Sequence, residues 1–233
     1  MNGQCVYCGS VGAVTRDHVP PKAVFSEPRP SNLITVPACQ TCHNDETSKD
    51  DEYFRLILHL REDLSGHPEV VKMREIIKRS LKKPEKFRLL KGLYETFQMA
   101  DSVTPAGIIV GRQLAFKADM NRLRRVVKRM VKGFFFHETG RRVPDEYDIL
   151  AASEDTVRNW PTKVQTEIVE GFVKPLLAQA PVVLGNSVFS YQAAFDRNDM
   201  NASAWMFTFY DRARFLGLTL PPVRLADGKA LGL

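Results

Sequence analysis

Four cysteines stand within the first 42 residues of the sequence, as two pairs with the spacing CxxC. Two thiolates at this spacing can face one metal ion from a tight turn, and two such pairs complete the tetrahedral sulfur set that Zn²⁺ accepts. Two disulfides or one redox-active pair would use the same residues, but the doubled motif favours a metal. The sequence therefore predicts a structural zinc site on Cys5, Cys8, Cys39 and Cys42.

The segment between the two cysteine pairs is longer than an ordinary zinc ribbon allows, and it carries other side chains with useful chemistry. Asp17 and His18 stand near the end of a strand predicted over residues 11–18, and a second strand is predicted over 32–37. Two prolines come shortly after His18 in the sequence, and they cannot donate the hydrogen bonds that would continue a sheet ladder. We therefore expect Asp17 and His18 to lie at an accessible strand end. A carboxylate suits a hard cation, and an imidazole can take up a proton near neutral pH.

The order of these residues resembles that of the HNH endonucleases, whose shared core is the ββα-metal finger. The resemblance rests on a CxxC pair, an Asp-His pair, an Asn-Leu pair and a second CxxC pair followed directly by histidine. It covers residues 5 to 60 approximately and implies hydrolysis of phosphodiester bonds in nucleic acid. It implies nothing about residues 65–233.

The resemblance also implies a role for each matching residue. Asp17 would be the first ligand of a divalent catalytic cation, and His18 the general base. Asn32 would hold the loop and His18 in place, and His43 would be the second cation ligand at the start of a helix. Aspartate at the first position departs from the literal His-Asn-His pattern and favours Mg²⁺ or Mn²⁺. The second ligand stays open among three consecutive residues: His43, Asn44 and Asp45.

Phosphodiester hydrolysis needs a deprotonated water on one side of the phosphorus and a cation near the leaving oxygen on the other. A histidine with an ordinary pKa is largely neutral in the cell and can accept that proton. Arg16 and Lys22 are placed to touch flanking phosphates, although each alone would be an ordinary surface charge. Each candidate residue also has a structural explanation, as a turn former, a packed imidazole or a helix-start residue. The nuclease hypothesis depends on their combination and order.

A basic segment stands apart from this motif. Residues 116–136 carry apolar side chains at alternating spacings of four and three, which predicts a helix. Basic side chains recur with the same period on another face: Arg122, Arg125, Arg129 and Lys132. No acidic residue falls between Arg122 and Lys132, so the stripe repels itself unless nucleic acid or distant acids neutralise it. Nucleic-acid binding and a solvated helix face both stay open.

The sequence as a whole predicts an α+β protein with two parts. Residues 1–64 form the zinc-clasped HNH finger and its helix, and residues 65–233 form a mainly helical region with a C-terminal antiparallel β meander. Helices are predicted over 68–82, 84–100 and 161–180 in addition to the basic helix. The meander is predicted from three aromatic-rich segments: SVFSYQAAFD, ASAWMFTFYD and RFLGLTL.

The sequence contains no apolar run long enough to span a membrane, and its first residues lack the features of a signal peptide. We therefore expect a cytoplasmic protein without a membrane partner. The net charge of +6 is compatible with an acidic partner such as nucleic acid. The resulting hypothesis is a metal-dependent HNH endonuclease with structural Zn²⁺ and catalytic Mg²⁺ or Mn²⁺, with DNA favoured over RNA as substrate. Two alternatives remain: a zinc protein that binds nucleic acid without cleavage, and a nuclease subunit active only with a protein partner.

Overall fold

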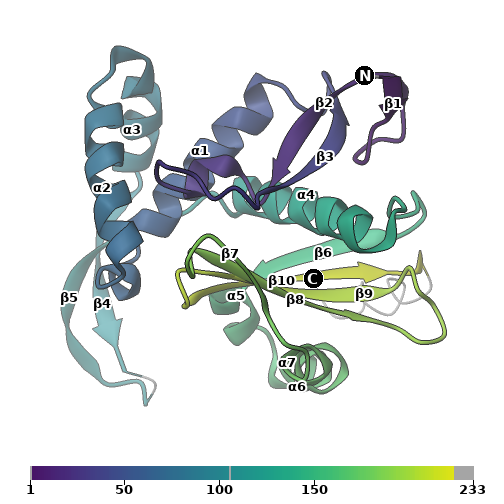
Figure 1. Ribbon diagram of the computed structural model, residues 1–233. Helices are drawn as coiled ribbons and strands as arrows, with labels where there is room; N and C mark the ends of the chain where they lie inside the picture. The colour runs from purple at the N-terminus through teal and green to yellow at the C-terminus, as the bar shows by residue number, and fades with distance from the viewer. Residues whose placement is uncertain (1, 105, 223–233) are drawn as a thin grey trace.

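The computed structural model describes residues 2–104 and 106–222 and has an α+β fold, as predicted (Figure 1). One long helix, α4 (Met120–Thr139), lies at the centre. It contacts α1 and β3 of the N-terminal region on one side and strands β6 and β10 of the C-terminal sheet on the other (Figure 1). Among the described helices, none combines the length and the apolar composition that a membrane span requires.

The N-terminal region has the strand, strand, helix order predicted for residues 1–64. Three antiparallel strands form a sheet in the order β1-β2-β3. Their bounds, and that of the helix that follows, are β1 Asn2–Gln4, β2 Val11–Val19, β3 Ile34–Cys39 and α1 Asp45–Leu60. The short helical turn Lys22–Val24 lies in the loop between β2 and β3. Helix α1 begins at Asp45 because the side chain of Asn44 accepts hydrogen bonds from the backbone N–H groups of Glu46 and Thr47.

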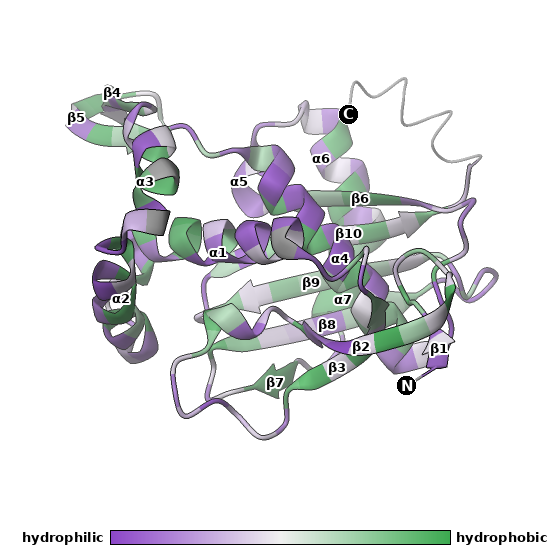
Figure 2. Ribbon diagram, turned by 90° about the horizontal axis from the view of Figure 1, so that it is seen from above, coloured by the Kyte–Doolittle hydropathy of each residue, from purple (hydrophilic) through white to green (hydrophobic). Residues whose placement is uncertain are grey.

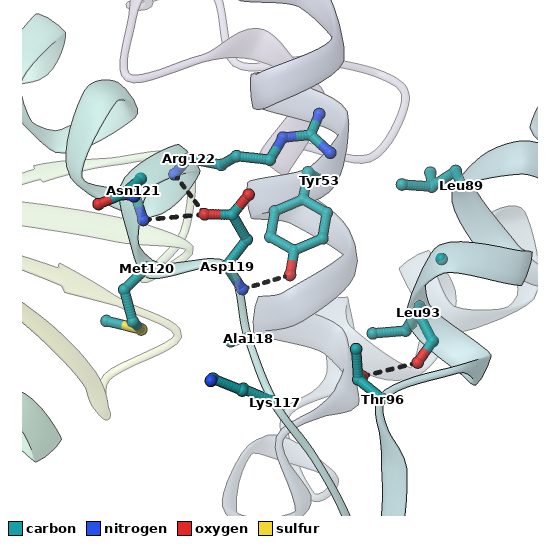
Figure 3. Close-up of a pocket in the computed structure, with 11 residues that line it drawn as sticks. Tyr53, Leu89, Leu93, Thr96, Lys117, Ala118, Asp119, Met120, Asn121 and Arg122 are labelled. Atoms are coloured by element: carbon teal, nitrogen blue, oxygen red, sulfur yellow. Dashed lines mark hydrogen bonds between the residues drawn. The ribbon is translucent and has the colours of Figure 1, made fainter.

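Helix α4 is fixed at both ends. The Asp119 carboxylate accepts hydrogen bonds from the backbone N–H groups of Asn121 and Arg122, which starts the helix (Figure 3). Gly140 ends it in a left-handed conformation with φ 69°. Midway, α4 comes very close to β2, since a Cβ on Gly133 would lie 2.7 Å from Cγ1 of Val19. The strand that carries Asp17 and His18 therefore rests directly on α4.

The C-terminal sheet has five antiparallel strands in the order β6-β10-β9-β8-β7. Their bounds are β6 Asp148–Ser153, β7 Val182–Leu184, β8 Phe189–Phe195, β9 Ser203–Phe209 and β10 Ala213–Leu220. The three aromatic-rich segments predicted as a meander are β8, β9 and β10. Strands β6 and β7 were not predicted. Aromatic side chains of the sheet pack on Phe134 of α4, with ring centroids 4.4 Å from Tyr191 and 5.4 Å from Phe207.

Further helices follow β6 and cover the other face of this sheet, and they are marked in Figure 1. They are α5 Glu154–Arg158, α6 Thr162–Ile168, a π-helical stretch Val169–Val173 and α7 Lys174–Leu177. The helix predicted over 161–180 is thus present from Thr162 to Leu177. Its regular α geometry is interrupted just before Pro175, the residue at which a bend was expected.

The middle of the chain contains one clear departure from prediction. Helices α2 (Pro68–Leu81) and α3 (Phe87–Tyr94) are present, preceded by the short turns Glu62–Leu64 and Pro84–Lys86. The helix predicted over 84–100 is wrong beyond Tyr94, because residues from Phe97 onward form a hairpin of β4 (Phe97–Val103) and β5 (Ile109–Phe116). Phe97 continues the helical spacing of the apolar residues before it, which concealed the change to strand alternation.

The predicted boundary at residue 64 stays a prediction. Buried side chains from both sides of it form one continuous core, in which Phe54 of α1 packs against Phe209 and Phe215 of the C-terminal sheet with ring centroids 5.2 Å from Phe215. The N-terminal finger is therefore supported by the rest of the chain.

Candidate metal centre and active site

The four cysteines converge as the sequence predicted. Cys5 and Cys8 lie in the turn between β1 and β2, Cys39 ends β3, and Cys42 lies in the turn before α1. Their sulfur atoms all lie within 4.8 Å of one another, and the Sγ atoms of Cys8 and Cys39 are 3.7 Å apart. Ligands at a Zn–S distance of about 2.3 Å in a tetrahedron lie about 3.8 Å from each other. The donor set and its spacing fit a structural zinc ion.

Asp17 and His43 face each other beside this cluster. The Nε2 atom of His43 lies 3.8 Å from Oδ1 of Asp17. The other ring nitrogen, Nδ1, lies 3.1 Å from the hydroxyl of Thr15, which itself donates to the carbonyl oxygen of Ala38. Because the only hydroxyl proton of Thr15 goes to Ala38, its oxygen is left to accept the Nδ1 proton of His43. In a neutral imidazole the lone pair of Nε2 then points at the Asp17 carboxylate.

A carboxylate oxygen and an imidazole nitrogen 3.8 Å apart can both reach one cation at about 2.1 Å from each. A second interaction that holds the other nitrogen of a ligand histidine is typical of metal sites. Asp17 is 6% exposed and the His43 side chain is 37% exposed, so the pair is open on the His43 side. Among the described side chains, two ligands converge here, which leaves positions for water and phosphate oxygens.

Two further side chains contact the second carboxylate oxygen of Asp17, Oδ2. The Tyr7 hydroxyl donates to Oδ2 at 2.7 Å, and burial raises the pKa of Tyr7 so that this phenol keeps its proton. Nε of Arg129 lies 3.7 Å from the same oxygen, while its Nη2 donates to Asp51 at 2.6 Å. Burial alone would lower the pKa of Arg129, but Asp51 and Asp17 raise it. Asp17 is thereby oriented with Oδ1 toward His43.

His18 is half-buried on β2, opposite Thr35 of β3. Successive side chains of a strand point to opposite faces, so His18 and Arg16 lie on the face away from Asp17. Burial lowers the pKa of His18 and the charge of Lys22 lowers it further, while Asp17 opposes both. The lowered pKa favours the neutral imidazole, and within the described residues its ring nitrogens make no hydrogen bond. The structure brings Asp17 and His43 together and leaves His18 as their neighbour.

The remaining residues of the motif lie in less specific places. Asn32 is exposed in the turn before β3 and lines a hollow together with Glu27 and Glu69. No hydrogen bond from its side chain to the His18 loop occurs in the described part of the chain, so its positioning role stays a prediction. Arg16 and Lys22 are both exposed, as contacts to phosphates require.

The structure separates the candidates for the second cation ligand. Asn44 uses its side-chain oxygen to cap α1 and its amide group to donate to the carbonyl oxygen of Thr41 at 2.7 Å. Its donors and acceptors are committed, whereas Nε2 of His43 points at Asp17. The side chain of Asp45 lies outside the part of the chain that the structure describes. The geometry favours His43.

The basic stripe of α4 meets acids of α1. Nε of Arg122 lies 2.8 Å from Oδ1 of Asp50, and Nε of Arg125 lies 2.7 Å from Oδ2 of the same residue. Arg129 pairs with Asp51 at 2.6 Å. Distant acids therefore neutralise the three arginines, which is one of the two explanations left open by the sequence. Their assignment to nucleic-acid binding stays a prediction, and the ion pairs weaken it most for Arg129, whose side chain is 13% exposed.

A groove of about 420 Å³ lies between α4 and the N-terminal finger. Tyr7, Cys42 and Thr47 line it from the finger, and Arg125, Lys128 and Lys132 line it from α4. Lys132 donates to the carbonyl oxygen of Tyr7 at 2.9 Å. Lys128 is exposed and has no ion pair within the described residues. In the sequence, Lys128 lies beside the basic stripe but was not among the candidate binding residues, and Tyr7 had no signal there at all.

Another pocket, of about 570 Å³, opens where α1, α3 and the start of α4 meet (Figure 3). Two of its polar groups have structural partners: the Tyr53 hydroxyl accepts from the backbone N–H of Asp119 at 2.7 Å, and the Asp119 carboxylate caps α4. The guanidinium of Arg122 lies 4.4 Å from the centroid of the Tyr53 ring. These contacts fix the start of the basic helix.

Comparison with known proteins places the site in a family context. A family model described as HNH endonuclease matches residues 5–49, a segment that includes the cysteine cluster, Asp17, His18, Asn32 and His43. No curated protein and no solved structure matches the chain. Residues 5–49 are therefore identified as an HNH endonuclease region with a four-cysteine cluster positioned to hold zinc.

Proposed function

We propose that this chain is a metal-dependent endonuclease that hydrolyses phosphodiester bonds in nucleic acid, with DNA as the favoured substrate. The observation that carries the proposal is the opposition of His43 Nε2 and Asp17 Oδ1 at 3.8 Å, beside His18 and within the HNH-matched segment. A carboxylate oxygen and an imidazole nitrogen that face each other are a pair of donor atoms that a divalent cation can bind.

Asp17 and His43 would hold the divalent cation, Mg²⁺ or Mn²⁺. When bound, such a cation supplies charge that stabilises the phosphate and the leaving alkoxide. Tyr7, Arg129 and Thr15 keep the two ligands oriented through the contacts described above. His18 would accept the proton of the attacking water, and its lowered pKa keeps it neutral for this purpose.

Zinc on the four cysteines would have a structural task. Held by these cysteines, it would join the β1-β2 turn to the end of β3 and the turn before α1, and so would help to fix His43 relative to Asp17. Purified without chelator, the protein should contain one Zn²⁺ per chain, because four thiolates outcompete the hard-ligand pair for that ion. An elemental analysis without zinc, together with four freely titrating thiols, would remove this part of the proposal.

Nuclease activity is tested with supercoiled plasmid and single-stranded substrates of DNA and RNA, incubated with Mg²⁺ or Mn²⁺ and with EDTA as a control. We expect cation-dependent cleavage, with a His18→Ala variant slower by about 10² to 10⁴-fold and still carrying zinc and binding substrate. Binding without cleavage by the wild type would favour the alternative of a zinc protein that only binds nucleic acid. Cleavage that needs an added protein would favour the nuclease-subunit alternative, and the expected cytoplasmic location is tested separately by fractionation.

A further inference from the structure

Each CxxC pair of the cysteine cluster has, within it or next to it, a side chain that reaches the candidate cation site. Tyr7 lies inside the first pair, and its hydroxyl donates to Oδ2 of Asp17 at 2.7 Å. His43 directly follows Cys42 of the second pair, and its Nε2 lies 3.8 Å from Oδ1 of the same aspartate. The two oxygens of one carboxylate are therefore contacted from the two halves of the cysteine cluster.

The backbone of the turn that carries Tyr7 is tied on two sides. Nζ of Lys132 donates to the carbonyl oxygen of Tyr7 at 2.9 Å, and the backbone N–H of Val6 donates to the carbonyl oxygen of Pro37 in β3 at 3.0 Å. Lys132 belongs to α4, which lies beside α1 and contacts β2 and β3 of the finger (Figures 1 and 2). Zinc would hold the same turn through its two thiolates. A phenol on a backbone fixed in this way holds the carboxylate in place.

Arg129 is a competing partner for the Asp17 carboxylate. Its Nε lies 3.7 Å from Oδ2, beyond hydrogen-bond range, while its Nη2 donates to Asp51 at 2.6 Å. Asp17 is 6% exposed, and a buried carboxylate this close to a guanidinium would close into a direct ion pair if nothing else held its oxygen. The Tyr7 hydroxyl holds that oxygen and so keeps Oδ1 available to a cation on the His43 side.

We propose that Tyr7 is a positioning residue that couples the two metal sites: zinc on the cysteines fixes the turn that carries Tyr7, and Tyr7 fixes Asp17 for the divalent cation. This coupling rests on the proposed function, because Asp17 and His43 are taken as the cation ligands. Coupling between two binding sites is reciprocal, so the divalent cation also raises the affinity for zinc. A tyrosine that served only the packing of the finger would affect stability and leave the affinity for the cation unchanged.

The first test measures Mn²⁺ binding to the zinc-loaded full-length chain by electron paramagnetic resonance, without substrate. Tyr7→Phe keeps the buried ring and removes the hydroxyl, so it should weaken Mn²⁺ binding by about tenfold or more and retain its zinc. Tyr147→Phe is the matched control, because the Tyr147 hydroxyl donates to a different carboxylate, that of Asp199, at the same distance of 2.7 Å. Its Mn²⁺ affinity should equal that of the wild type, whereas Asp17→Ala should lose the site.

The second test measures the reciprocal effect and begins with the wild type alone. Zinc affinity is determined at equilibrium by competition with a zinc-selective chelator, with saturating Mg²⁺ and without it at the same ionic strength. Mg²⁺ should raise the zinc affinity of the wild type and of Tyr147→Phe by about fivefold or more. The rise should be absent in Asp17→Ala and much smaller in Tyr7→Phe. A wild type whose zinc affinity does not respond to Mg²⁺ would overturn the coupling.

The outcomes distinguish failure of the coupling from failure of the cation site. If the wild type binds Mn²⁺ and Asp17→Ala does not, the site stands, and equal Mn²⁺ affinities of Tyr7→Phe and the wild type then overturn the coupling alone. Loss of zinc from Tyr7→Phe would also overturn it, because the hydroxyl would then serve the cysteine turn instead of Asp17. A wild type that binds no Mn²⁺ would remove the cation site and the coupling together.

Discussion

Arg129 of α4 places Nε 3.7 Å from Oδ2 of Asp17, so a helix outside the HNH-matched segment reaches the candidate cation site. The same guanidinium donates to Asp51 at 2.6 Å and is almost wholly buried. The contact joins α4, α1 and β2 at one point. The finger is therefore completed by a part of the chain far from it in sequence.

Arg129→Gln should lower the free energy of unfolding by about 3 kcal/mol, because it leaves two buried carboxylates, Asp17 and Asp51, without their cation. Arg125→Gln is the matched control. Arg125 is 59% exposed and its partner Asp50 keeps Arg122, so the loss there should be below about 1 kcal/mol. Urea unfolding of both variants and the wild type measures the difference. Equal losses of unfolding free energy in the two variants would mean that the buried ion pairs of Arg129 stabilise the fold no more than the exposed pair of Arg125.

The basic residues of α4 should contribute to nucleic-acid binding in the opposite order to their contribution to stability: an exposed residue should matter and the buried arginine should not. Lys128→Gln should reduce the slope of log affinity against log salt by about 0.9, because Lys128 is exposed, lies in the groove beside the finger and is free to neutralise a phosphate. Arg129→Gln should leave the slope unchanged, since its charge is already balanced by Asp51. Fluorescence anisotropy with a labelled duplex at several salt concentrations gives both slopes. An unchanged slope for Lys128→Gln would indicate that this face of α4 is only solvated and does not bind nucleic acid.

Local patterns in the sequence predicted the structural features that depend on residues close together in the chain. The CxxC pairs gave the cysteine cluster, and strand alternation gave β2 within one residue of its observed end at Val19. The pairing of Asp50 with Arg122 spans 72 residues and has no local signature. For the same reason the sequence suggested a self-repelling stripe where the structure has ion pairs. The hairpin of β4 and β5 was missed because Phe97 fits both the helical spacing before it and the strand alternation after it.

A buried histidine far from the motif predicts a pH dependence of stability. His59 is 4% exposed, its Nδ1 donates to the carbonyl oxygen of Arg55 at 2.7 Å, and burial lowers its pKa to about 4. Since the folded pKa lies below the unfolded value of about 6.5, the native state binds fewer protons in that window. The stabilisation is full above about pH 6.5 and is lost as the pH falls toward 4, with about 2 kcal/mol lost by pH 5.

The measurement compares urea unfolding at several pH values for the wild type and His59→Gln. Burial raises the pKa of Asp51 to about 6, so this group titrates in the same window with the opposite sign. The two effects offset each other in the wild type, and the His59→Gln variant should therefore gain stability relative to it on acidification. His137→Gln, at an exposed position near the end of α4, is the control and should follow the wild type. Parallel curves for all three proteins would contradict a neutral buried His59.

The last prediction concerns the second cation ligand. His43→Ala should raise the concentration of Mn²⁺ needed for half-maximal cleavage, because it removes the imidazole nitrogen that faces Oδ1 of Asp17. Asn44→Ala should leave that concentration unchanged and lower stability by about 1 kcal/mol, since Asn44 serves as the cap of α1. Thr15→Val provides an intermediate case: the His43 ring keeps its nitrogens but loses the oxygen that holds Nδ1 at 3.1 Å. Its cation requirement should lie between those of the wild type and His43→Ala, with zinc content unchanged in all variants. A normal Mn²⁺ requirement in His43→Ala with a raised one in Asn44→Ala would reverse the assignment and place the cation at the start of α1.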